Sequence, residues 1–157
     1  MTCAETTIWS VMSYFGTKYH EYRQAYPSDI IRVLANTSSE RLLPSKGLTA
    51  YAISRVLCHF GLGTRVYWKN AYQQEEFKRL IHYYIESGIP VIAIVKNEKV
   101  CHAVVLIGHS NIDGGKPPSA RPLSTNISVI DTADFERKYV VSDDNSAPFR
   151  THGFLKD

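Results

Sequence analysis

The chain has 157 residues, of which 44% are hydrophobic and 21% charged, which is the size of one domain and excludes wholesale disorder. A formal net charge of +3 with scattered basic residues is too small to indicate a nucleic-acid or membrane-surface partner. No run of about 18 apolar residues indicates a membrane span, and three cysteines without a signal peptide favour a reducing, cytoplasmic compartment. We therefore expect a single domain over residues 1–157.

Apolar residues at helical spacing predict two helices near the start of the chain. The first begins at Cys3, with Thr2 as its N-cap, and ends at Gly16. The second covers residues 28–35, with Ser28 as its cap. The apolar residues expected to face inward on this second helix are Ile30, Ile31 and Leu34.

Two further helices are expected at residues 49–60 and 73–87. Each is followed by a glycine, Gly61 or Gly88, which is typical of a helix end. Residues 36–47 between the second and third helices have the composition of a loop. Cys58 is expected on the inward face of the third helix.

Strand patterns dominate the second half of the chain. A tight turn at residues 97–99 predicts that the two strongest strands form an antiparallel hairpin. Glycines and prolines predict a surface loop over residues 110–125. The expected strands, the first of them weak, are residues 65–68, 90–96, 100–109, 126–130 and 139–142. Helices followed by an antiparallel sheet indicate the α+β class.

Cys3 is the first residue whose position indicates chemistry. A thiol at a helix N-terminus lies against the positive end of the helix dipole, which favours the nucleophilic thiolate. A buried or merely terminal cysteine is the alternative interpretation, because free cysteines are often simply packed in cores.

His102 opens the strand at residues 100–109, and acidic residues follow two later strands. An acid just beyond a strand end can hold an imidazole in one tautomer and stabilise its cation. Asp143 follows the strand at 139–142, and Asp131 follows the strand at 126–130 as its rival. The alternatives are a core histidine and ordinary turn residues, since Asp is common in turns.

Three segments together resemble papain-like cysteine peptidases, and within them the bacteriocin-processing (double-glycine leader) peptidase family. Cys3-Ala4-Glu5-Thr6-Thr7 with its following apolar helix resembles the nucleophile helix of that family. Gly88-Ile89-Pro90-Val91 and the run from His102 to Gly108 resemble its "G-x-P-V" and catalytic-histidine strands. Residues 139–143 resemble the strand that ends in its catalytic Asp.

The resemblance implies a papain-like fold, with N-terminal helices packed on a C-terminal antiparallel sheet. The family's N-terminal strand, which carries its oxyanion-hole Gln, has no counterpart before Cys3. It implies that Cys3 is the nucleophile, His102 the general base and then acid, and Asp143 the residue that orients His102. The implied reaction is hydrolysis of a peptide or protein substrate through a thioester acyl-enzyme, without a cofactor. The oligomeric state stays open.

Two departures from the family pattern favour an alternative function. Ala4 and Glu5 stand where the family has Gly and Pro, and the family's oxyanion-hole Gln has no counterpart among the two residues before Cys3. Removing one oxyanion donor costs about 2.7–4 kcal/mol of transition-state stabilisation. The alternative is a degenerate peptidase-fold domain that binds a peptide or partner without cleaving it.

Cys58-His59 and Cys101-His102 are tandem pairs of potential zinc ligands, to which Cys3, His82 or His109 could add further ligands. The short Cys-x₂₋₄-Cys spacing of structural zinc sites is absent from the sequence. We therefore expect no metal.

Overall fold

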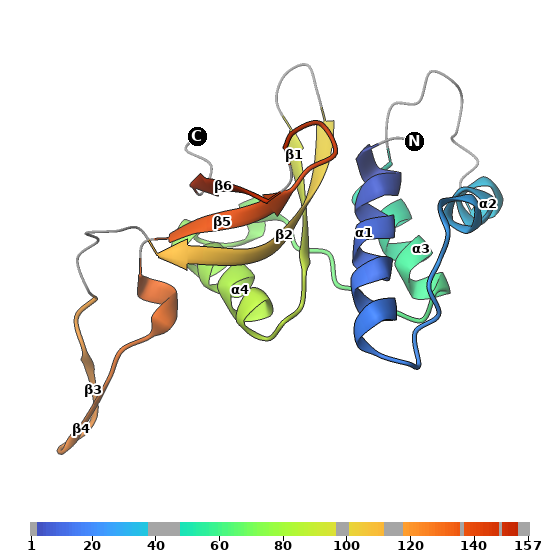
Figure 1. The fold of residues 1–157 in the computed structure, drawn as a ribbon. Coiled ribbons are helices and arrows are strands. Elements are labelled where there is room, and N and C mark those ends of the chain that lie inside the picture. Colours follow the sequence, from blue (N-terminus) through green and yellow to red (C-terminus); the bar gives the residue numbers. More distant parts are fainter. Residues whose placement is uncertain are drawn as a thin grey trace. The chain divides into compact units, whose positions relative to one another are not determined.

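The computed structural model describes residues 3–37, 48–96, 101–111, 118–135, 137–147 and 149–153. The Thr2 cap, the turn at 97–99 and most of the loop at 36–47 lie outside these residues. In the described part, the four α-helices precede the strands along the chain (Figure 1), and the predicted α+β class is confirmed. No helix of the described part is both long and apolar enough to cross a membrane.

Four α-helices and two short 3-10 helices are present in the described residues. The helices are α1 (Cys3–Lys18), α2 (Pro27–Thr37), α3 (Ala50–His59), η1 (Lys69–Ala71), α4 (Gln74–Glu86) and η2 (Thr132–Asp134). The strands are β1 (Val91–Lys96), β2 (Cys101–Asn111), β3 (Arg121–Ser124), β4 (Ile127–Val129), β5 (Arg137–Ser142) and β6 (Arg150–Gly153).

The chain divides into two compact units, each built from segments that are far apart in the sequence. The first comprises Met1–Tyr67, Ile92–Val105 and Ser142–Pro148, and the second comprises Trp68–Val91, Leu106–Val141 and Phe149–Asp157.

The first unit has a hydrophobic core between α1, α2, α3 and the beginning of β2. Ile8, Ile30 and Val56, one from each helix, are fully buried, and Ala103 and Val105 of β2 belong to the same cluster. Alternate residues of a strand point to the same face, so Ala103 and Val105 present one apolar face of β2 to the helices. Burying these side chains stabilises the unit by the hydrophobic effect.

The first two helices differ at their ends from the prediction. α1 continues to Lys18, so Gly16 does not end it; a Cβ at Gly16 would lie 3.0 Å from the Gln24 side chain, and glycine permits this close approach. α2 begins at Pro27, not at Ser28, as suits proline in a first helical turn. Ile31 was expected inside but is 39% exposed, while Val33 is buried in its place.

The third and fourth helices are confirmed. The Thr49 side chain accepts a hydrogen bond from the Ala52 N–H, and Gln73 and Glu76 form a capping box at the start of α4. Gly61 and Gly88 adopt positive φ angles of 89° and 71°, which favour glycine after a helix end.

The main sheet has four antiparallel strands in the order β1-β2-β5-β6. β1 and β2 are neighbours, as the predicted hairpin requires, and β5 pairs with β6 with Tyr139 opposite His152. The weak strand expected at 65–68 is wrong, because this segment has no strand pairing. β6 was not predicted, since the short polar run Arg150–Gly153 has no apolar alternation.

The predicted loop at 110–125 is partly wrong. β2 continues to Asn111, and Arg121–Ser124 forms β3, which pairs antiparallel with β4 in a separate two-stranded sheet. Every residue of β3 and β4 is exposed. Backbone pairing, without a buried face, therefore defines this ribbon.

Candidate functional site

His102 and Asp143 meet because their strands are neighbours. His102 is the second residue of β2, and Asp143 directly follows β5. β2 and β5 are adjacent and antiparallel, which brings the beginning of one to the end of the other. The distance from His102 Nε2 to Asp143 Oδ1 is 2.7 Å.

This contact defines the chemistry of the imidazole. A carboxylate only accepts hydrogen bonds, so the His102 nitrogen facing Asp143 is the protonated Nε2–H. In the neutral ring the other nitrogen, Nδ1, then carries the lone pair that can take a proton. The side chains of His102 and Asp143 are 21% and 20% exposed, so the pair is shielded but still open to solvent.

Asp143 is held as an anion by its hydrogen bonds. Its Oδ1 also accepts the Asn145 backbone N–H at 2.9 Å. Burial acts to raise the pKa of Asp143, but the hydrogen bonds from Asn145 and His102 outweigh it, and the pKa lies below its ordinary value. The carboxylate is therefore ionised at neutral pH and can stabilise a protonated His102.

The other acids contribute less to His102. Asp144 Oδ1 lies 4.0 Å from His102 Nε2, beyond hydrogen-bonding distance. Asp131, the rival considered from the sequence, belongs to the second unit, where it accepts the Ala133 N–H at 2.9 Å and the Tyr83 hydroxyl at 2.8 Å. The bond from the Ala133 N–H makes Asp131 the N-cap of η2.

Cys3 is the first residue of α1 and is half-buried against the helical core. One turn later, the Thr7 hydroxyl donates to the Ala103 carbonyl oxygen at 3.0 Å, next to His102 in the chain. Residues i and i+4 share a helix face, so Cys3 and Thr7 lie on the same side of α1. The first turns of α1 therefore lie along the beginning of β2, which carries His102.

The Cys3 thiol and the His102 ring are not hydrogen-bonded to each other in the described part of the chain. The side chains that follow Cys3 point into the protein, since Ala4 and Glu5 are 2% and 1% exposed. Catalytic hydrogen bonds are often long without substrate and shorten when it binds. The Thr7–Ala103 bond thus places α1 beside β2, but by strand alternation the His102 side chain leaves β2 on the face opposite to Ala103, so this bond does not place the sulfur against the imidazole.

The remaining cysteines lie on the surface. Cys58 was expected on the inward face of α3, but it is exposed, because the buried stripe runs through Ala52, Ile53, Val56 and Leu57. The Cys58 sulfur lies 3.2 Å from the Thr64 hydroxyl, and Cys101 is also exposed. All three cysteines are free thiols.

The sequence named His82 and His109 only as partners of the Cys-His pairs in a zinc site, and did not predict the polar cluster that they form with Glu86 and Arg137 in the second unit. His82 belongs to α4 and is 1% exposed. Burial, and next the positive charge of Arg137, lower the pKa of His82, so its ring is neutral near pH 7. Glu86 and His109 lie beside it.

A depression of about 300 Å³ in the first unit lies at α2 and the end of α3, with Arg32 and His59 among its lining residues. Neither Cys3, His102 nor Asp143 lines it.

No family model, curated protein or solved structure matches this chain.

Proposed function

We propose that the chain is a cysteine-dependent hydrolase of peptide or amide bonds, with a papain-like arrangement of Cys3, His102 and Asp143. The observation that carries the proposal is the 2.7 Å contact between His102 Nε2 and Asp143 Oδ1. It leaves Nδ1 of His102 as the basic nitrogen, on a strand whose beginning is bonded to the helix that starts with Cys3.

The proposed reaction has two steps. The Cys3 sulfhydryl proton passes to His102 Nδ1, and the sulfur attacks the substrate carbonyl carbon to form a tetrahedral oxyanion. His102 then returns that proton to the leaving amine as the C–N bond breaks, which leaves a thioester on Cys3. Water attacks the thioester carbonyl, His102 takes a proton from this water, and the carboxylic acid leaves as the proton returns to sulfur.

A second function, peptide binding without cleavage, is favoured by the residues after Cys3. Glu5 lies two residues from the thiol and is buried, and a nearby carboxylate opposes formation of a thiolate. A degenerate site would keep the His102–Asp143 pair as part of its scaffold and bind the substrate without forming a thioester.

Alkylation by iodoacetamide tests the proposal. Cys58 and Cys101 are exposed whereas Cys3 is half-buried, so access alone predicts that Cys3 reacts slowest. An imidazole base that promotes the thiolate reverses this order, and we expect Cys3 to react about tenfold or more faster than the other two near pH 7. Mass spectrometry of peptides from each cysteine measures the three rates in one sample.

Matched variants separate catalysis from local structure. His102→Ala is expected to reduce the alkylation rate of Cys3 to that of an ordinary half-buried thiol. His20 is exposed and does not belong to the proposed triad, so His20→Ala is expected to leave this rate unchanged. If Cys3 reacts more slowly than Cys58 and Cys101, or does not respond to His102→Ala, hydrolysis is excluded and the binding function remains.

A further inference from the structure

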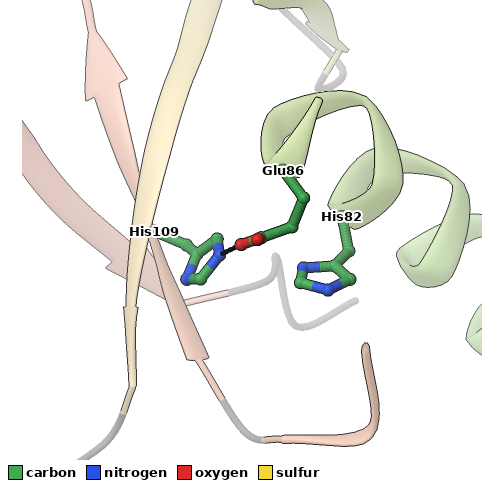
Figure 2. Close-up of side chains that lie close together, drawn as sticks. All are labelled: His82, Glu86 and His109. Carbon is green, nitrogen blue, oxygen red and sulfur yellow. Dashed lines mark hydrogen bonds and ion pairs between the residues drawn. The ribbon is translucent and has the colours of Figure 1, made fainter. Parts of the chain in front are cut away.

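Three metal-ligand side chains converge in the second unit. His82 and Glu86 are four residues apart and thus lie on one face of α4, and His109 reaches them from β2 (Figure 2). Glu86 Oε1 and His109 Nε2 are in direct contact, and one ligand atom from each of the three residues lies within 4.8 Å of the others. None of the three takes part in the proposed hydrolysis.

Two observations describe the polar groups of this cluster. His109 turns its Nε2 toward Glu86, while its Nδ1 is buried and has no hydrogen-bond partner among the described residues. A guanidinium NH1 of Arg137 occupies the space between the histidines, in contact with His82 Nδ1 and 3.5 Å from His109 Nε2. The cluster therefore already surrounds one cationic group with ligand atoms.

The ligand chemistry is that of borderline divalent metals. Two imidazoles and one carboxylate form the three-protein-ligand set that zinc uses with water in a fourth position. Metal–ligand distances of about 2.0–2.2 Å require Glu86 Oε1 and His109 Nε2, which are in direct contact, to separate as the ion enters, while the His82 ligand atom lies within 4.8 Å of both. Thr132 Oγ1, 2.9 Å from His82 Nε2, supplies the outer hydrogen bond that orients such a ligand and leaves Nδ1 for the metal.

We propose that His82, Glu86 and His109 bind one divalent transition-metal ion of the zinc class, in competition with the guanidinium of Arg137. The Arg137 side chain is held by its Nε–H, which donates to the Phe135 carbonyl oxygen at 3.1 Å. Its NH1 end is the part that must move aside when the ion enters. The metal ion thus replaces the guanidinium of Arg137 at the cluster, and the strand pairing of β5 stays intact.

Titration of the metal-free full-length chain with Co²⁺ tests the site. We expect one equivalent to bind with absorption typical of nitrogen and oxygen ligands and without a thiolate charge-transfer band. A thiolate band would place the ion at a cysteine and overturn the proposal. Zn²⁺ is expected to displace the cobalt, and failure of the wild-type chain to bind either ion would also overturn it.

Variants identify the ligands. Glu86→Gln and His109→Gln are expected to weaken binding about 10–100-fold or more, because each removes a ligand without emptying the core. Glu75→Gln on the same helix, whose side chain is 75% exposed and pairs with Lys78, is the matched control with unchanged binding. Equal affinity in wild type, Glu86→Gln and His109→Gln would mean adventitious surface binding and overturn the proposal.

Arg137→Met tests whether the guanidinium of Arg137 competes with the metal ion for the cluster. Loss of the guanidinium should tighten binding about tenfold, whereas a purely structural arginine would leave it unchanged or weaken it. Circular dichroism checks that each variant is folded. If Arg137→Met binds more weakly while remaining folded, the competing role of Arg137 is excluded.

Discussion

At the scale of single residues, the contact between His102 and Asp143 has a consequence for stability as well as for chemistry. Because the pKa of Asp143 is lower in the folded chain than its ordinary value of about 3.9, the folded state binds this proton less readily than the unfolded state. Protonation of Asp143 therefore favours unfolding.

The expected result is a pH-dependent contribution to the free energy of unfolding. The contribution from Asp143 is complete above the ordinary carboxyl pKa of about 3.9 and is lost as pH falls through the lowered folded pKa. Urea unfolding between neutral pH and pH 3 should show a steeper acid loss of stability in wild type than in Asp143→Asn. Asp144→Asn is the control, because its carboxylate lies 4.0 Å from His102.

Equal acid slopes for wild type and Asp143→Asn would contradict this assignment of the pKa. A steeper acid loss of stability in Asp143→Asn than in wild type would mean that folding raises the pKa of Asp143 instead of lowering it.

The residue scale is also where sequence patterns are least decisive. The i, i+4 pattern identified Ile30 and Leu34 as inward-facing, and both are fully buried. The same pattern predicted that Ile31 and Cys58 face inward, but both side chains are exposed. Each directly follows a buried residue, and the step of about 100° between neighbours carries it beyond the edge of the buried stripe. Only packing partners determine how wide a stripe becomes.

At the scale of elements, one hydrogen bond joins the nucleophile helix to the histidine strand. The Thr7 hydroxyl on α1 donates to the Ala103 carbonyl oxygen on β2 in a buried position. Thr7 lies one turn beyond Cys3, and Ala103 lies next to His102. The bond therefore joins the helix that begins with Cys3 to the strand that carries His102.

Thr7→Val removes the hydrogen bond to Ala103 with little change in side-chain volume, and should lower both the stability of the chain and the reactivity of Cys3. Valine has nearly the same shape but removes the hydroxyl that donates to the buried Ala103 carbonyl, and a buried hydrogen bond contributes about 0.5–1.5 kcal/mol of stability. We also expect slower alkylation of Cys3, because α1 is less firmly held on β2. Denaturant unfolding and the iodoacetamide assay measure the two effects.

Thr7→Ser is the matched control, since it retains the hydroxyl and loses one methyl group worth about 0.8 kcal/mol. Thr7→Ser should keep the wild-type alkylation rate of Cys3. The coupling is disproved if iodoacetamide modifies Cys3 at the wild-type rate in Thr7→Val, or equally slowly in both variants.

At the scale of the whole molecule, two compact units share continuous strands. β2 begins in the first unit and ends in the second, because the division falls between Val105 and Leu106. β5 likewise ends at Ser142, which belongs to the first unit. Because the backbone of β2 and of β5 runs without interruption from one unit into the other, we expect one cooperative transition.

Ile8→Ala tests this expectation. Ile8 on α1 is fully buried in the first unit, and its truncation should cost about 2–5 kcal/mol. Hydrogen exchange measured by mass spectrometry should then show reduced protection in α4, in the second unit, to the same extent as in α1. Unchanged protection in α4 would mean that the two units unfold independently.

The sequence by itself determined the helix periods, their caps and glycine ends, and the main apolar strands. These features depend on neighbours within a few residues: Thr49 caps its own helix, and Gly61 and Gly88 supply the positive φ that follows a helix end. Local chemistry also identified Cys3, His102 and Asp143 as candidates.

Tertiary structure alone decided which candidates meet. Asp143, and not Asp131, contacts His102 because β5 lies beside β2, a pairing between residues 41 apart that no local pattern specifies. The same holds for His82, which lies among Glu86, His109 and Arg137 only once α4 and the later strands of the second unit are folded. Contacts distant in sequence depend on strand order and packing, and these are properties of the whole chain.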